Sequence, residues 1–180
     1  MDVHAPDFVQ VQHKEHLLYG VAEVAWLDLR LQLPDRAPVI GIDPGQVNMG
    51  LTVLRGRGAW SYQIKLPSTL DPVERVTECI HVVTYLLERE NITGCRRACV
   101  EYAAFAALYG QVALAENRTS AVVALLKANT LQIDIPSPST IRKEVFGTAK
   151  EKAEELWPFI PKDAASSLGC ALYAFKKAEG

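Results

Sequence analysis

The stretch from residue 39 to residue 55 constrains the fold of this 180-residue chain most strongly. Residues 39–42 are a run of β-branched and small apolar residues, which is typical of a strand buried on both faces. The run ends at Asp43, and the Pro-Gly pair after it turns the chain into a second expected strand over residues 49–54. We therefore expect a hairpin with a carboxylate at the end of its first strand. Asp43 could bind a metal ion there or could simply cap the turn, because Asp-Pro-Gly is also ordinary turn chemistry.

The rest of the chain alternates between strand and helix patterns. Asp71 followed by proline predicts a helix start, and apolar residues at helical spacing extend that helix to about residue 89. Further strands are expected over residues 59–66, 97–101 and 131–135, and further helices over residues 111–129, 140–146, 149–157 and 163–177. The order βββαβαβα predicts an α/β fold with a mixed five-stranded sheet and helices on both faces.

The N-terminal residues differ from this pattern. Residues 1–16 show little periodicity, which favours a solvated tail. Leucines at 27, 29, 31 and 33 alternate with polar residues, which predicts a half-exposed strand, either an added edge strand or part of an oligomer contact. We therefore divide the chain into an N-terminal extension, residues 1–37, and a main domain, residues 38–180.

Composition limits the possible classes of protein. A hydrophobic content of 49% in 180 residues predicts one domain with a sizeable core. No apolar run of about 18 residues predicts a membrane span, and the N-terminus lacks the pattern of a secretion signal. The net charge of −2 implies that any DNA-binding face is a local patch. The four cysteines form no paired metal-ligand motif, which favours free thiols in a reducing cytoplasm.

Three carboxylates occupy comparable places in the predicted fold. Asp43 and Glu101 each end a strand, and Asp163 opens the last helix. If the two strands are neighbours, the three side chains would meet, and their repulsion would be costly without cations. Such oxygen ligands suit Mg²⁺ or Mn²⁺, and a pair of these ions supports phosphodiester cleavage. Glu101 could instead be a surface charge and Asp163 a helix N-cap.

Four motifs over residues 38–177 together resemble those of the RuvC-type Holliday junction resolvases, which belong to the RNase H-like (retroviral integrase) superfamily. In chain order they are Gly41-Ile42-Asp43-Pro44-Gly45 with Gly50; Val100-Glu101; Lys143 with Gly147-Thr148-Ala149-Lys150; and Asp163-Ala164-Ala165 with Leu168 and Ala171. The resemblance implies an RNase H-like fold and a homodimeric endonuclease that makes paired nicks in four-way DNA junctions during recombination and repair. It implies Mg²⁺ as cofactor, two ions per site, with Mn²⁺ as a substitute, and neither a nucleotide cofactor nor a membrane partner. We expect a cytoplasmic protein of bacterial or phage origin.

The same resemblance assigns roles to individual residues. Asp43, Glu101 and Asp163 would bind the metal and, together with Lys150, would be catalytic. Basic residues would contact the DNA near the scissile phosphate, and an aromatic ring would stack on bases at the junction. The residues expected to bind DNA are Arg142, Lys143, Lys150, Tyr102 and Phe105. The lysines could instead belong to a solvated helix face, and the phenylalanine could instead fill the core.

Two departures from the family pattern keep other functions open. Ser166 stands where the family commonly has a further Asp, and Phe105 lies four residues beyond Glu101 rather than three. A RuvC-like protein that binds junctions with weak or no catalysis is therefore an alternative, as is an RNase H-like nuclease acting on another branched or hybrid nucleic acid. An actin-like or sugar-kinase ATPase would need two such domains, for which 180 residues are too few.

Overall fold

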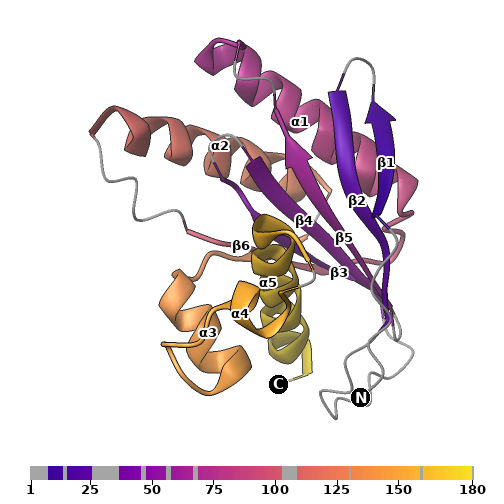
Figure 1. Cartoon of the computed structure of the whole chain (residues 1–180), viewed down its shortest axis with the longest axis vertical. Coiled ribbons are helices and arrows are strands. Elements are labelled where there is room, and N and C mark those ends of the chain that lie inside the picture. The colour runs from indigo at the N-terminus through magenta and orange to yellow at the C-terminus, as the bar shows by residue number, and fades with distance from the viewer. Residues whose placement is uncertain are drawn as a thin grey trace.

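The computed structural model describes residues 8–13, 16–25, 37–45, 48–55, 58–66, 69–102, 109–129, 131–158 and 160–179, with side chains from residue 37 onward except 109–115, 117 and 179. Seven strands form one mixed sheet in the order β1-β2-β5-β4-β3-β6-β7 (Figure 1). The strands are β1 Phe8–His13, β2 His16–Ala25, β3 Val39–Asp43, β4 Asn48–Arg55, β5 Gly58–Lys65, β6 Arg97–Val100 and β7 Gln132–Asp134. Neighbouring strands are antiparallel from β1 to β3, whereas β3, β6 and β7 are parallel.

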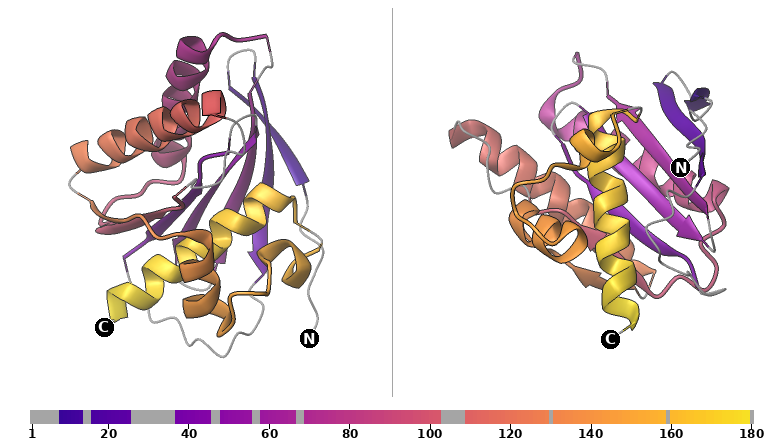
Figure 2. Two further views of the ribbon diagram at one scale, coloured as in Figure 1. Left: turned by 90° about the vertical axis from the view of Figure 1, so that its left-hand side faces the viewer. Right: turned by 60° about the horizontal axis from the view of Figure 1, so that its bottom comes forward.

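Helices cover both faces of the sheet (Figure 2). They are α1 Pro72–Arg89, α2 Tyr109–Ala128, α3 Pro138–Phe146, α4 Ala153–Leu156 and α5 Lys162–Glu179. Helices α1 and α2 lie on one face, and α3, α4 and α5 lie on the other. None of the described helices combines the length and the apolar character that a bilayer crossing requires.

Local chemistry explains where helix α1 begins. The Asp71 carboxylate accepts hydrogen bonds from the backbone N–H groups of Val73 and Glu74, and the Glu74 carboxylate accepts one from the Asp71 N–H. This reciprocal capping box satisfies donors that the first turn leaves free, and Pro72 presets the helical φ angle. The helix start predicted from the Asp-Pro pair is confirmed.

The fold class predicted from the sequence is confirmed, and its N-terminal part needs a correction. The five expected strands form β3 to β7, and two further strands from the N-terminal residues extend the sheet at β5. A solvated tail over residues 1–16 is therefore wrong for residues 8–13 and 16, where backbone pairing between β1 and β2 outweighs the weak periodicity. The strand expected over residues 27–33 lies outside the described residues. The boundary at residue 37 stays a prediction.

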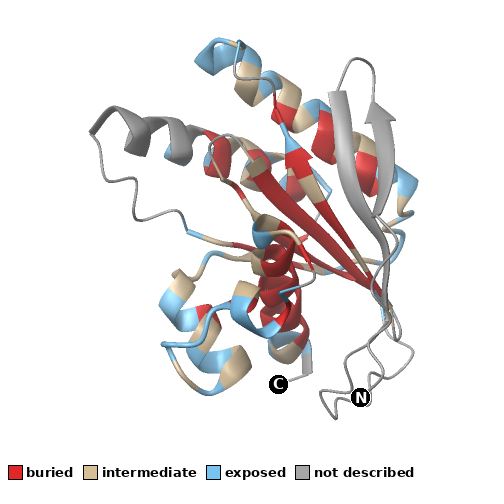
Figure 3. Cartoon of the chain, viewed as in Figure 1, coloured by how far each residue is buried: buried red, intermediate tan, exposed pale blue. Residues whose placement is uncertain are grey.

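Buried residues lie on the central strands and on the helices that cover them (Figure 3), and they form two apolar cores on opposite sides of the sheet. The two cores differ in the size of their side chains. The side facing α1 and α2 is filled by large residues of the central strands, such as Ile40, Ile42 and Leu51. The side facing α5 presents smaller residues at the alternate strand positions, among them Gly41 and Gly50. Since a helix packs closest where side chains are small, α5 can lie directly on the central strands.

The contact between α5 and the sheet is tight enough to exclude any side chain at two glycines. A Cβ atom built on Gly41 would lie 2.1 Å from the Ser167 carbonyl oxygen, and one built on Gly50 would lie 1.8 Å from the Asp163 carbonyl oxygen. A buried hydroxyl network joins the same surfaces, because Thr52 Oγ1 lies 2.9 Å from Ser61 Oγ and 2.8 Å from Ser167 Oγ. These contacts fix α5 along the sheet in one position.

This packing predicts that Gly41→Ala destabilises the protein, by about 1–3 kcal/mol or more, because the added methyl group meets helix backbone that cannot move aside alone. Urea denaturation of the metal-free protein measures the effect. Gly169→Ala, in helix α5, is the matched control. Among the described residues, its Cβ would meet Ile141 Cγ2 at 3.7 Å and Phe146 Cζ at 3.8 Å, which are ordinary contacts. We expect that control to be neutral or to gain about 0.5–1 kcal/mol. Equal effects at the two glycines would contradict the close packing.

Candidate functional site

The central strand β3 delivers Asp43 to the edge of the sheet where parallel strands end. Asp43 is opposite Gly50 of β4, and on its other side the chain leaving β6 donates a hydrogen bond from the Glu101 N–H to the Ile42 carbonyl, at 2.9 Å. The alternation of side chains along a strand places Asp43 on the same face as Gly41, which is the face that α5 covers. Asp43 and Glu101 therefore follow adjacent strands at one end of the sheet.

Helix α5 brings the third carboxylate to this edge. Asp163 lies in the first turn of α5, where the positive end of the helix dipole favours a negative charge. One of its carboxylate oxygens, Oδ2, accepts a 2.7 Å hydrogen bond from Gln63 Nε2 of β5. The other, Oδ1, would lie 3.9 Å from a Cβ atom on Gly45, in the turn that follows Asp43. Residues far apart in the sequence thus meet at one place.

Electrostatics shows how closely the three acidic groups interact. Burial raises the pKa of Asp43 well above its ordinary value, and the negative charges of Glu101 and Asp163 raise it further. Burial also raises the pKa of Glu101 to about 7 and raises the pKa of Asp163. Asp43 is the shared member of the cluster, since the charges of both Glu101 and Asp163 act on its carboxyl group. Such shifts are typical of functional sites, although buried structural carboxyls show them too.

Polar and charged neighbours modify this cluster. The cationic side chain of Lys162 lowers the pKa values of all three carboxyls, and that of Arg142 lowers the pKa of Glu101. A hydrogen bond from the Ser166 side chain lowers the pKa of Asp43. Glu154, which immediately follows the first residue of α4, raises the pKa values of Glu101 and Asp163.

The donor set fits a hard divalent cation in its chemistry. It consists of carboxylate oxygens on partly buried side chains, which is what Mg²⁺ and Mn²⁺ prefer. Two amide oxygens on the same face of β4 and β5, Asn48 Oδ1 and Gln63 Oε1, are buried and have no hydrogen-bond partner in the described part of the chain. Within the part of the chain that the structure describes, no three Asp, Glu, His or Cys side chains are already close enough to hold an ion. The carboxyl groups would have to move toward one another before one ion could touch all three.

The residues expected to bind DNA are distributed around the acidic cluster. Arg142 is half-buried on α3, and its charge acts on Glu101. Lys143 on the same helix and Lys150 in the loop after it are exposed, and they are not among the charges that shift the three carboxyls most. Tyr102, directly after Glu101, is 42% exposed, and its N–H donates to the Pro136 carbonyl at 2.9 Å. Phe105 lies outside the described residues.

Three residues near the cluster escape the motif-based reasoning. Gln63 lies on β5 between the buried Tyr62 and Ile64. The alternation of polar and apolar residues along that strand was the sequence signal that could have placed it on the other face of the sheet. Lys162 directly precedes Asp163 in the sequence. Arg118 of α2 is buried and donates from Nη1 to the Gly45 carbonyl at 2.5 Å, which supports the turn after Asp43 from the other face.

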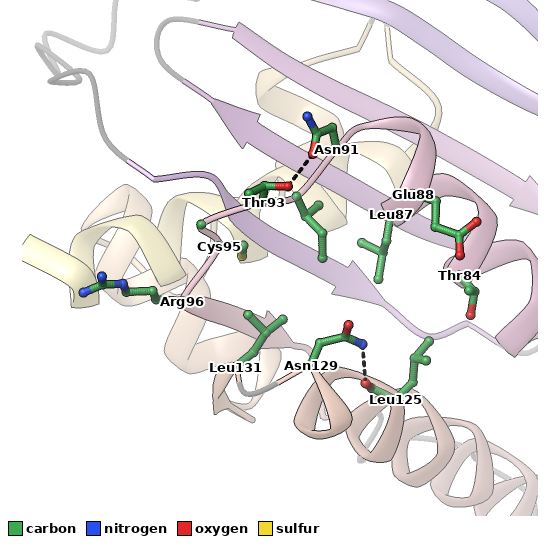
Figure 4. Close-up of a pocket in the computed structure, with 12 residues that line it drawn as sticks. Thr84, Leu87, Glu88, Asn91, Thr93, Cys95, Arg96, Leu125, Asn129 and Leu131 are labelled. Atoms are coloured by element: carbon green, nitrogen blue, oxygen red, sulfur yellow. Dashed lines mark hydrogen bonds between the residues drawn. The ribbon is translucent and has the colours of Figure 1, made fainter.

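A hollow of about 570 Å³ lies away from these residues (Figure 4). It is lined by the end of α1, the loop over residues 91–96 and the end of α2, with Glu88, Asn91, Arg96 and Asn129 among its polar groups. That loop enters β6, whereas Glu101 follows the far end of the same strand. The hollow and the acidic cluster therefore lie at opposite ends of β6.

The order of strands and the acidic residues at their ends define an RNase H-like α/β fold. No protein-family model and no curated protein sequence matches the chain. Among solved structures, Thermus thermophilus RuvC is similar with 22% identity and a TM-score of 0.63, over 79% of this chain and 96% of that one. A T. thermophilus RuvC in complex with a Holliday junction substrate is similar with 20% identity and a TM-score of 0.64, over 81% and 97%. The yeast mitochondrial Holliday junction resolvase Ydc2 is similar with 18% identity and a TM-score of 0.52, over 79% of each chain.

The particular fold is therefore that of the RuvC-type resolvases, as the sequence motifs predicted. At these identities the likeness establishes the fold and not the activity. The positions of Asp43, Glu101 and Asp163 come from the structure of this chain, described above, and the roles of these residues stay predictions.

The raised pKa of Glu101 predicts how stability depends on pH in the metal-free protein. The folded state holds the proton up to about pH 7, whereas an unfolded glutamate releases it near its ordinary value of 4.5. Folding therefore binds protons between these values, and the free energy of unfolding falls as pH rises from about 5 to 8, by on the order of 3 kcal/mol from Glu101. Denaturation in EDTA across this range measures the slope.

Glu101→Gln is the control for this pH dependence, because a glutamine has no proton to release. We expect its free energy of unfolding to change much less across the same range. A wild-type protein that becomes more stable from pH 5 to pH 8 would contradict the electrostatic description of the cluster.

Proposed function

We propose that the protein is a divalent-metal-dependent endonuclease that resolves four-way DNA junctions by paired phosphodiester nicks. The observation that carries this proposal is that Asp43, Glu101 and Asp163 lie around one edge of the sheet, near enough for the charges of Glu101 and Asp163 to act on Asp43. The fold adds support, because a structurally similar RuvC is described in complex with a Holliday junction substrate. The likeness of the fold to that RuvC favours DNA as the substrate over a small molecule.

Asp43, Glu101 and Asp163 would hold the metal. Asp43 would be the central ligand, because the charges of the other two carboxylates both act on it. A pair of Mg²⁺ ions supplies an activated water and stabilises the leaving oxygen in phosphodiester hydrolysis. The protein would contribute a rigid support, since β3 and the first turn of α5 hold two of the three ligands. Mn²⁺ has similar ligand preferences and should substitute.

Basic and aromatic residues around the cluster would bind the DNA. Lys162 and Arg142 are cationic and close enough to the carboxylates to change their pKa values, so both would face a phosphate bound there. Lys143 and Lys150 are exposed on α3 and in the loop after it, in position for phosphates further along the strand. Tyr102 presents an exposed ring beside Glu101, which suits stacking on an unpaired base; Phe105 would assist it.

Two symmetric cuts need two active sites, so we propose a homodimer with one site in each protomer. Paired nicks would then appear at symmetric positions on opposite strands of a junction. A protein that nicks one strand only, or that is monomeric on the junction, would contradict this part of the proposal.

Cleavage of a synthetic four-way junction, labelled on each strand in turn, tests the function. We expect nicks in Mg²⁺ and in Mn²⁺, none in EDTA, and little cleavage of a linear duplex of the same sequence. Glu101→Gln keeps the shape but removes a metal ligand, and several kcal/mol of lost charge stabilisation corresponds to about a 10³-fold lower rate. Glu88→Gln is the matched control and should cleave normally, because Glu88 of α1 lines the hollow at the other end of β6.

An unchanged rate of junction cleavage in Glu101→Gln would contradict the assignment of Glu101 as a metal ligand. A panel with RNA–DNA hybrids and other branched DNA decides whether the four-way junction is the preferred substrate. Faster cleavage of a hybrid than of the junction would favour the alternative RNase H-like nuclease.

A second candidate function is junction binding with weak or no cleavage. The observation that favours it is Ser166, whose hydroxyl bonds to Asp43 where the family commonly has a carboxylate. Binding of the junction without nicks in both Mg²⁺ and Mn²⁺ would support this function.

Ser166→Asp separates the two candidates. A fourth carboxylate beside Asp43 should lower the stability of the metal-free protein by like-charge repulsion and should lower the Mg²⁺ concentration needed for nicking. Denaturation in EDTA and a Mg²⁺ titration of junction cleavage measure these two effects. A variant that cleaves no better than the wild type at low Mg²⁺ would show that the hydroxyl does not limit the site.

A further inference from the structure

Gln63 is the described side chain that links the β4–β5 hairpin directly to the acidic cluster. It lies on β5 opposite Gly50, on the sheet face that α5 covers, and it is partly buried. Gly50 has no side chain and allows the Asp163 backbone to lie directly above it. Gln63 is therefore the neighbour that reaches the Asp163 carboxylate from the sheet.

The hydrogen bond fixes the orientation of that carboxylate. Gln63 Nε2 donates to Asp163 Oδ2 at 2.7 Å. This contact leaves Oδ1 on the side of Gly45, where it would lie 3.9 Å from a Cβ atom. Gly45 belongs to the turn that follows Asp43, so the hydrogen bond leaves Oδ1 on the side of that turn.

A contribution to stability alone does not account for an amide at this position. Its oxygen, Oε1, is buried and has no hydrogen-bond partner among the described residues. An acceptor left in that state costs free energy, which offsets the gain from the single bond to Asp163. A leucine of similar size would remove the unpaired acceptor at little cost.

Asp163 is also the acidic residue of the first turn of α5, and Ser166 in the next turn has no carboxylate to share its role. If α5 offers one carboxylate to a cation at this point, the orientation of that carboxylate decides how well the site is formed. In proteins, a partner that orients a ligand in this way is typically worth 10–100-fold in metal affinity.

We propose that Gln63 is a positioning residue, which orients the Asp163 carboxylate toward Asp43 so that the cluster binds a divalent cation. The inference rests on the metal-dependent function proposed above. Gln63 touches neither the DNA nor the reacting atoms in this account. It acts through Asp163.

The test compares Mn²⁺ binding in the wild type and in Gln63→Leu, measured by electron paramagnetic resonance without DNA. We expect Mn²⁺ affinity to fall about tenfold or more. The midpoint of urea denaturation in EDTA should change little, since the loss of the hydrogen bond to Asp163 and the loss of the unpaired acceptor offset each other. Gln132→Leu, an exposed glutamine on β7, is the matched control and should bind Mn²⁺ normally. If Gln63→Leu does not fold, Gln63→Met removes the same donor with a flexible side chain.

Junction cleavage adds a readout that a purely structural role would not change. In Gln63→Leu the Mn²⁺ concentration for half-maximal nicking should rise by the same factor, whereas the rate at saturating Mn²⁺ should stay within about threefold of the wild type. A lower rate at every Mn²⁺ concentration, with unchanged Mn²⁺ affinity, would overturn the positioning role.

The outcomes distinguish this inference from the proposed function. Equal Mn²⁺ affinity in Gln63→Leu and in the wild type overturns the role of Gln63 and leaves the nuclease intact. A wild type that binds Mn²⁺ but cleaves no junction overturns the nuclease, while the ratio of Mn²⁺ affinities still decides the role of Gln63. A wild type that binds no Mn²⁺ overturns both.

Discussion

The rest of the structure depends on direct contact between the backbone of α5 and the central strands. Gly41 and Gly50 provide the space, since a Cβ atom at either would overlap a helix carbonyl group. The buried hydroxyls of Thr52 and Ser167 then hold the helix at one position along β4. Because Asp163 is in the first turn of α5, the same contact decides where its carboxylate lies. The position of the site is thus a consequence of packing in the core.

Bringing three carboxylates together works against folding, and the surroundings offset this only in part. Lys162, Arg142 and the Ser166 side chain stabilise the charged forms, while burial and Glu154 oppose them. The net result is a rise in all three pKa values, so the metal-free protein holds protons that isolated carboxyls would release. A divalent cation would replace those protons and remove the repulsion that they relieve. Cation binding at such a site would therefore raise the free energy of unfolding as well as supply the chemistry.

The sequence predicted what local patterns encode and missed what depends on tertiary contact. The β3–β4 hairpin, the capped start of α1 and the order of the five main strands follow from short-range alternation and turn residues, and all are present. The N-terminal strands β1 and β2 were missed because their patterns are weak, and because the pairing that joins β2 to β5 is a long-range contact. Asp43, Glu101 and Asp163 were predicted from motifs, and their roles stay predictions. Gln63 and Arg118 were not, since their importance arises from a partner distant in the sequence.

The two faces of the sheet explain why the acidic cluster lies beside α5. On the face of α1 and α2, large buried side chains such as Ile42 and Leu51 keep the helices at a distance from the strands. From that side Arg118 donates a hydrogen bond to the Gly45 carbonyl and so supports the turn. On the α5 face, small residues let helix backbone and strand meet, so short side chains such as Asp43 and Asp163 can approach one another. An aspartate side chain is short, so its carboxylate can approach another only where the two backbones lie close together, as those of β3 and α5 do on this face.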